Sequence, residues 1–204
     1  NRGPVDVGLT STSDHDSEAT VEAGSEGGIA LTPAAAIAVI TNDTSAIIGT
    51  GALLTVSGAL AAQATHRGST STKSRAEVAG EDVAFGVVVA VTDAQDNVSA
   101  DSARDINAAG TVLLKADSNA VSAADAKSSA KGASDTTSND ANTEANRQLD
   151  EGGSTQNVEA GDTETSDGAV GIAAAVGVNL SDSVTTAKVS AGTLTSGDLV
   201  TIES

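Results

Sequence analysis

Residues 77–97 read EVAGEDVAFGVVVAVTDAQDN, a short junction followed by an apolar run and a polar Asp/Asn cluster. A similar junction, VEAG, occurs at residues 21–24 and again at residues 158–161, and each is followed by its own apolar run. A polar cluster that closes an apolar run is typical of a strand that meets a turn. Because a chain that repeats its own architecture usually builds an extended object, the sequence predicts an elongated molecule.

Large aromatic side chains are almost absent. Phe85 is the only Phe, Tyr or Trp among 204 residues, and the chain has no Met or Cys. Val, Ile, Leu and Ala must therefore fill any core, and Phe85 is expected to lie in it. Small side chains pack well in thin layers, whereas a thick globular core normally uses larger rings. The composition favours a thin, layered structure.

Short segments with an apolar/polar period of two supply further strands. They are residues 53–57 (LLTVS), 111–117 (TVLLKAD) and 199–203 (LVTIE), and this period is typical of half-buried β-strands. Residues 120–133 are rich in Ala and Ser, which leaves both a short helix and a surface loop open there. The sequence predicts an all-β fold, a repetitive β-solenoid-like or stacked β-repeat rod with a small-residue core of Val, Ile and Ala.

The chain is interpreted as one continuous elongated domain. Its parts are the polar tail of an incomplete repeat (1–20), a first repeat (21–77), a second repeat (78–157) and an incomplete third repeat (158–204). An acidic insertion at about residues 134–167 has too few large apolar side chains to form core. The third repeat lacks the polar tail that residues 1–20 resemble, so either the segment belongs to a longer repetitive chain or copies join head to tail, and both readings imply a continuing fibre.

Open sheet edges must be covered or paired, and a further copy of the chain can pair them. The first and last strands are the expected joint. Its residues are Val5, Val7 and Leu9 at one end and Leu199, Val200 and Ile202 at the other.

The strong acidity excludes several partners. Twenty-eight acidic residues against ten basic ones give a net charge of −18, which repels phosphate backbones, so no nucleic-acid partner is expected.

The apolar runs at residues 29–40 and 169–180 are well below the ~20 residues that a membrane-spanning helix needs. No membrane insertion is expected.

Few residues offer catalytic or metal chemistry. Asp14-His15-Asp16 is either a metal or acid–base cluster or a solvated loop, and the loop is favoured because His66 is the only other histidine. No nucleophile elbow or oxyanion motif accompanies the serines, so the chain is not expected to be an enzyme. Calcium is the one cofactor considered. Its weak candidate ligands are Asp93, Asp96, Asp101 and Asp105.

Two surface features remain open. Asn-x-Ser/Thr sequons at Asn42, Asn97 and Asn179 each follow an apolar run, so they are glycosylation candidates expected at exposed turns. Thr-x-Thr pairs raise an ice-binding alternative, in which a ladder of threonines on one face orders water. The pairs are Thr10/Thr12, Thr70/Thr72, Thr163/Thr165 and Thr193/Thr195.

Residues 171–204 (GIAAAVGVNLSDSVTTAKVSAGTLTSGDLVTIES) and 84–100 (AFGVVVAVTDAQDNVSA) carry a resemblance. Their order of apolar strand, polar turn, short connection and second strand resembles the repeats of large bacterial filamentous adhesins of the leukotoxin type and of autotransporter-type surface proteins. The resemblance implies a β-rich or β-solenoid stalk exported to the cell surface, and it supplies no catalytic residues. The acidic insertion and the high acidity depart from it.

Two functions follow as hypotheses. The first is a structural subunit or segment of an extracellular filament or adhesin stalk, a head-to-tail homopolymer at the cell surface. The alternative is a surface-binding module, either an adhesin or an ice-binding β-solenoid, with cell-surface or matrix components as partners.

Overall fold

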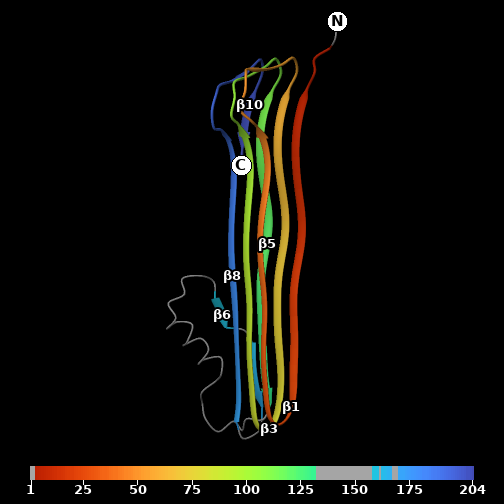
Figure 1. Cartoon of the computed structure of the whole chain (residues 1–204), viewed down its shortest axis with the longest axis vertical. Coiled ribbons are helices and arrows are strands. Elements are labelled where there is room, and N and C mark those ends of the chain that lie inside the picture. The colour runs from red at the N-terminus through yellow and green to blue at the C-terminus, as the bar shows by residue number, and fades with distance from the viewer. Residues whose placement is uncertain (1–2, 132–157, 161, 167–169) are drawn as a thin grey trace.

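A computed structural model describes residues 3–131, 158–160, 162–166 and 170–204 (Figure 1). These residues form strands and connections, and none of them is helical. The strands are β1 (Val7–Ile48), β2 (Leu54–Val56), β3 (Leu60–Ser102), β4 (Ile106–Ala108), β5 (Val112–Lys131), β6 (Val158–Ala160), β7 (Asp162–Ser166), β8 (Val170–Val189), β9 (Leu194–Ser196) and β10 (Val200–Glu203). The predicted all-β, β-solenoid-like fold is confirmed at this level.

The two longest strands, β1 and β3, each run the full length of the molecule, reverse, and return beside themselves (Figure 1). They pair in parallel along nearly their whole length, and the register shifts only between Gly27 and Ile29, near the reversal. Gly27 has a φ of 147°, a value that favours glycine. Glycine at this position therefore allows the backbone to reverse direction within β1.

Each circuit of the chain is called a coil here, and its two long sides are the first arm and the return arm. The first arms are residues 7–26, 60–79 and 112–131 of coils 1, 2 and 3. The return arms are residues 29–48, 83–102 and 170–189 of the same coils. The short strands β2, β4 and β9 stack in parallel at one end of the coils, and β10 begins a fourth coil on β5.

The interior lies between the first arms and the return arms. Side chains alternate between this interior and the outside, so that Ala62 and Ala64 of one arm and Val98 and Ala100 of the other are buried in one cluster. Alanine is the commonest apolar residue buried in the described part of the chain. The interior is filled mainly by alanine and valine, with a few larger side chains such as Leu60 and Leu114, so the chain builds it without Phe, Tyr or Trp.

The molecule is longest along its arms. Twenty residues at about 3.3 Å each make an arm of about 66 Å, whereas each further coil adds only about 5 Å in the stacking direction. The short dimension is therefore the direction in which coils are added.

Two local predictions were wrong. Phe85 lies on the outside of the return arm, between Leu31 of coil 1 and Ile172 of coil 3. The Ala/Ser-rich segment is neither helix nor loop as far as Lys131, because β5 continues through it with Ala126 and Ala130 buried. The inward positions of this segment hold small side chains, which fit the narrow interior, so the segment is a strand rather than a solvated helix.

The three similar junctions do not stack on one another. The ladder pairs Gly24 with Glu77 and Gly27 with Gly80, so the first two junctions are three residues out of register. In the third junction, Val158 pairs with Val178 in an antiparallel ladder between β6 and β8. Most of the predicted acidic insertion lies outside the described residues, and its end forms β6 and β7.

Overpacking of the narrow interior should destabilise the fold. Ala90→Leu places a larger side chain at a fully buried position and should lower the free energy of unfolding by about 1–3 kcal/mol, measured by urea denaturation. Ala35→Leu is the matched control, because Ala35 pairs with the neighbouring Val89 but is exposed. Equal stability of the two variants would contradict the assignment of the interior.

Candidate functional site

The predicted assembly residues occupy both ends of the same interior columns. Val7 stacks on Leu60, Leu60 on Val112, and Val112 on Val200. Leu60 and Val112 are 2% and 1% exposed, whereas Val7 and Val200 at the two ends are 42% and 40% exposed. The column is therefore buried in the middle and open at both ends.

A second column repeats this arrangement two residues further on. Leu9 stacks on Ala62, Ala62 on Leu114, and Leu114 on Ile202. Leu9 and Ile202 are again the exposed members. Val5 and Leu199 lie just outside the ladders and are also exposed, and the backbone N–H of Val5 donates a 3.0 Å hydrogen bond to Ser57 Oγ. The residues at both ends therefore expose apolar side chains that an added coil would cover.

The backbone edges at the two ends of the stack differ. Among the described residues, β1 pairs only with β3, so one edge of coil 1 is open from Val7 to Ile48. At the other end, three short strands cover parts of coil 3: β10 and β7 pair with β5, and β6 pairs with β8. Open N–H and C=O groups on a long, flat edge are a template for pairing with another strand.

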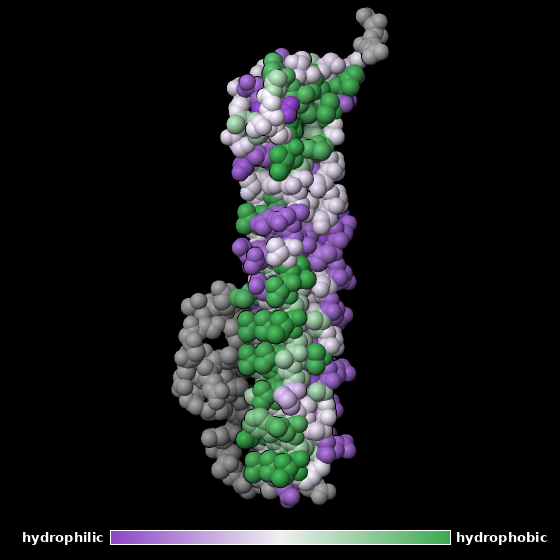
Figure 2. Space-filling view, in the orientation of Figure 1, coloured by the Kyte–Doolittle hydropathy of each residue, from purple (hydrophilic) through white to green (hydrophobic). Residues whose placement is uncertain are grey.

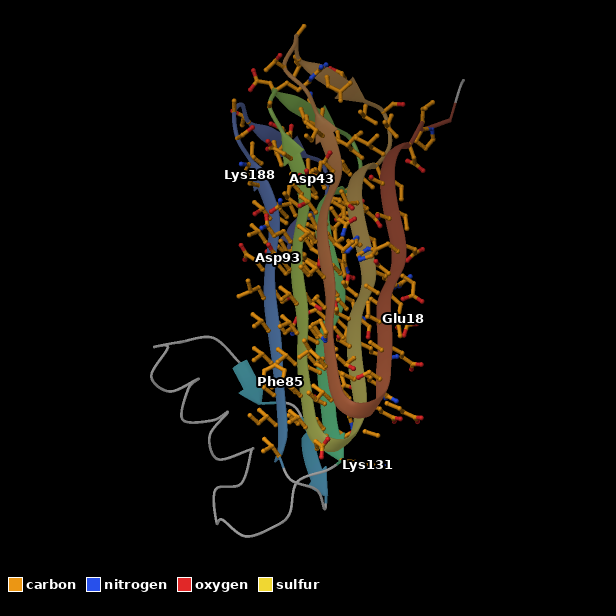
Figure 3. All side chains as sticks on the ribbon, turned by 60° about the horizontal axis from the view of Figure 1, so that its bottom comes forward. Glu18, Asp43, Phe85, Asp93, Lys131 and Lys188 are labelled. Atoms are coloured by element: carbon orange, nitrogen blue, oxygen red, sulfur yellow. The ribbon has the colours of Figure 1, made fainter. Side chains whose placement is uncertain are left out.

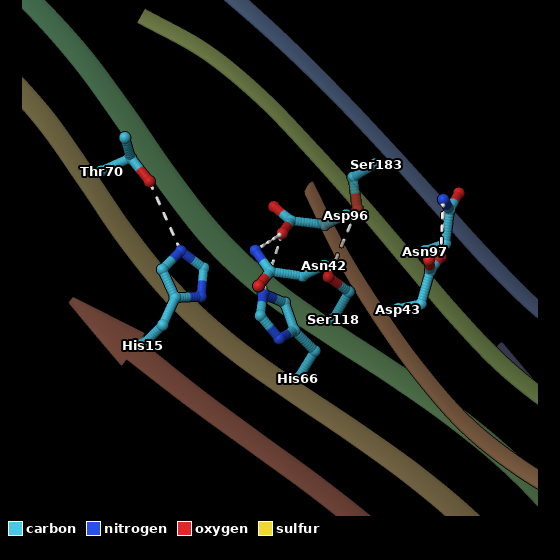
Figure 4. Close-up of polar contacts among 9 residues, drawn as sticks. All are labelled: His15, Asn42, Asp43, His66, Thr70, Asp96, Asn97, Ser118 and Ser183. Atoms are coloured by element: carbon cyan, nitrogen blue, oxygen red, sulfur yellow. Dashed lines mark hydrogen bonds and ion pairs between the residues drawn. The ribbon is translucent and has the colours of Figure 1, made fainter. Parts of the chain in front are cut away.

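A cluster of two histidines and one aspartate lies inside the stack (Figure 4). The rings of His15 in coil 1 and His66 in coil 2 are stacked, with their centroids 5.1 Å apart and their planes at 22°. Asp96 reaches them from the return arm of coil 2, and its Oδ1 lies 3.0 Å from Nε2 of His66. His66 and Asp96 are almost completely buried, at 1% and 2% exposure.

Gly68 makes room for the cluster. In the ladder, His15 stands opposite Gly68, and His66 lies two residues before it on the same arm. A Cβ at position 68 would lie 2.3 Å from Cε1 of His15 and 2.9 Å from Nε2 of His66. Because Gly68 has no side chain, the two rings can occupy this space.

The cluster was missed by the sequence analysis, which favoured a solvated loop for residues 14–16. Asp14 and Asp16 do face outward, but His15 between them faces the interior. The available signal was alternation: in a strand, the middle residue of Asp-His-Asp points away from its neighbours. What the sequence lacked was the register that brings His15 beside His66.

The four predicted calcium ligands do not converge. Asp96 joins the histidines, whereas Asp93 and Asp101 point outward. Asp101 Oδ1 accepts a hydrogen bond from the backbone N–H of Ser190, and Asp105 Oδ1 accepts one from that of Thr193. These two carboxylates join coil 2 to coil 3, and calcium binding remains a prediction.

The three sequons lie within strands rather than at turns. Asn42 and Asn179 point inward: Asn42 Nδ2 donates to Asp96 Oδ1 at 2.9 Å, and Asn179 Nδ2 donates to the Ser122 carbonyl at 3.2 Å. Asn97 is exposed and donates to Asp43 Oδ1 at 3.0 Å. Of the three, Asn97 is the one whose side chain faces solvent.

The outer face of the return arms is apolar over its half near the reversal (Figure 2). Its ladders join one residue from each coil, for example Leu31, Phe85 and Ile172, and Figure 3 marks Phe85 on this sheet. Of the Thr-x-Thr pairs, Thr70 and Thr72 are buried, and Thr72 shares a 2.6 Å hydrogen bond with Thr92 across the interior, whereas Thr10 and Thr12 are exposed. The ice-binding alternative remains a prediction.

No protein-family model, no curated protein and no solved structure matches this chain. In the part of the chain that the structure describes, no helix is long and apolar enough to cross a membrane. The function must therefore be argued from the geometry of the chain itself.

One ion pair between coils 1 and 2 has a measurable titration. Lys73 Nζ donates to Glu18 Oε1 at 2.7 Å and holds the pKa of that carboxyl below its usual value. Lys73→Ala should raise the pKa of Glu18 in an NMR titration, and Lys115→Ala, which removes a distant lysine, should leave it unchanged. Because the folded-state pKa is the lower one, the small stabilisation is present above the unfolded pKa and is lost as the pH falls through the folded value.

An unchanged Glu18 titration in Lys73→Ala would contradict the ion pair between the first arms of coils 1 and 2.

Proposed function

We propose that the chain is a structural subunit or segment of an extracellular filament or adhesin stalk, a repetitive β-solenoid with a small-residue interior. Copies join head to tail by adding coils to the stack. The observation that carries the proposal is the pair of open interior columns, with Val7 and Leu9 at one end and Val200 and Ile202 at the other. Further coils continue these columns, whether they belong to the same chain or to a second copy.

Addition of a coil is favourable because it extends two long ladders at once. Each arm of coil 3 has 20 residues, so a stacked coil forms backbone hydrogen bonds along two such arms. It also buries the apolar column ends, which contributes roughly 25 cal/mol per Å² of apolar surface removed from water. At the coil 3 end, a new copy continues the columns from β10 and must replace or bypass the short strands β6 and β7, which gives growth a direction.

The charge of the chain limits assembly to one direction. A net charge of −18 makes the sides of neighbouring stacks repel one another. At the open ends, by contrast, backbone pairing and apolar burial act at contact distance. The combination favours long, separate filaments over lateral aggregates.

The alternative, a surface-binding module, is supported by the apolar outer face of the return arms. Leu31 and Ile172 are exposed there beside the partly exposed Phe85. A contiguous apolar patch on a protein surface often marks an interaction site. In this reading, the coils are a scaffold and the face makes the contact with a cell-surface or matrix component.

Assembly through the column ends can be blocked by one inward charge. Ser17 lies on the inward side of coil 1 and pairs with the buried Thr70, so Ser17→Lys is tolerated at an open end but would be buried under an added coil. Electron microscopy and sedimentation velocity should show fibres for the unmodified chain and only single particles for this variant.

Thr12→Lys is the matched control, because it adds the same charge to the same arm on an exposed position. Its fibres should be retained. Assembly that survives Ser17→Lys, or is lost equally in both variants, would contradict growth through the coil ends.

The binding alternative has its own variant. Leu31→Ser on the outer face should leave end-to-end assembly intact, because Leu31 points away from the interior. If the face is adhesive, the variant should adsorb several-fold less to an apolar surface in a quartz-crystal microbalance. Unchanged adsorption would count against a binding role for this face.

A further inference from the structure

We propose that His15, His66 and Asp96 bind a divalent transition-metal ion, with Zn²⁺ as the representative, inside the stack between coils 1 and 2. Each residue offers one ligand atom, and the three atoms lie within 4.8 Å of one another. Ligands that share a metal at about 2.0–2.2 Å stand at most about 4.4 Å apart. The two stacked rings must therefore turn so that one nitrogen of each points, with Asp96, at the same ion.

The hydrogen bonding of the cluster is incomplete without an ion. His15 Nδ1 and both ring nitrogens of His66 are buried without a hydrogen-bond partner. Nε2 of His66 and Oδ1 of Asp96 approach to 3.0 Å, yet the ring nitrogen makes no hydrogen bond there. Unpartnered buried polar atoms are costly, and a metal ion coordinated by one nitrogen of each ring removes that cost for the two coordinating nitrogens.

Neighbouring residues hold two of the ligands in place. Asn42 Nδ2 donates to Asp96 Oδ1 at 2.9 Å, which orients the carboxylate. Thr70 Oγ1 lies 3.4 Å from Nε2 of His15, so Nδ1 of the same ring is the nitrogen that faces the cluster without a partner. Support of this kind for metal-binding histidines and carboxylates is the rule in metal sites.

The donor set indicates the kind of ion. Two imidazoles and one carboxylate suit Zn²⁺ and the neighbouring transition metals, whereas Ca²⁺ and Mg²⁺ prefer oxygen ligands only. Three protein ligands leave a fourth position for water. His15 belongs to the terminal coil and is only partly buried, so an ion can reach it from the open edge of that coil.

The ion would act as a staple. It would join the first arm of coil 1 to the first arm of coil 2 through the histidines, and both to the return arm of coil 2 through Asp96. Backbone hydrogen bonds fix the spacing of the coils, but a metal at this place also fixes the terminal coil across the interior. Loss of the ion should therefore loosen coil 1 first.

The test is titration of the untagged chain with ZnSO₄ by isothermal calorimetry, together with Co²⁺ loading followed by its visible absorption. One specific ion per chain is expected, with a Co²⁺ spectrum of a low-coordinate nitrogen/oxygen site. Zinc at about 100 times its dissociation constant should raise the melting temperature by about 5–10 °C.

Two variants remove the site in different ways. Asp96→Asn removes the carboxylate ligand while keeping its shape, and Gly68→Ala keeps every ligand but places a Cβ in the space of the His15 ring. Each should weaken zinc binding at least tenfold and abolish the Co²⁺ spectrum. Their matched controls are Asp93→Asn, an outward carboxylate on the same arm, and Gly8→Ala, where a Cβ meets nothing.

Controls that bind zinc like the unmodified chain, beside variants that do not, would support the site. Zinc binding that is absent, or that is equal in variants and controls and so belongs to the acidic surface, would overturn it. Circular dichroism of each variant separates loss of the ligand from loss of the fold, and the Gly68→Ala chain retains all three donors for that comparison.

Discussion

The close approach of the two arms within each coil is the constraint on which the rest of the structure depends. Facing sheets are normally about 10 Å apart, and in that space only small or slender inward side chains can meet without strain. The alanines of the interior satisfy it, as Ala64 and Ala100 do in one of the apolar clusters. The one Phe, Phe85, lies on the outside because its neighbours Ala84 and Gly86 take the inward positions.

The interior is not uniformly apolar. Apolar clusters fill both ends of the arms, while His66, Thr72, Thr92 and Asp96 occupy the section between them. Thr72 and Thr92 share a hydrogen bond across the interior, whereas the ring nitrogens of His66 make no hydrogen bond, although Nε2 lies 3.0 Å from Asp96 Oδ1. Buried polar groups without partners lower the stability of the fold, and apolar residues at the same positions would not. The histidine cluster is therefore better explained by a bound ligand than by a contribution to stability.

Much of the fold could be predicted from local pattern, and little of the candidate site could. Alternation identified the columns of Val112 and Val200 because inward and outward positions differ along each strand. It failed for residues 120–131, because Ala and Ser have no strong preference that marks a strand. It also failed for the junctions, because shared letters at Gly24 and Gly80 do not set the register, which follows from backbone pairing around the whole coil. The histidine cluster depends on that register and therefore could not be predicted from the sequence.

The most direct test of this account is fibre diffraction, or cryo-electron microscopy, of the assembled chain. Growth by coil addition predicts a spacing of about 4.8 Å along the fibre axis, with the arms lying across a fibre about 66 Å wide. A spacing of about 4.8 Å perpendicular to the axis would mean that copies join at the tips of their arms, and it would contradict assembly through the open columns.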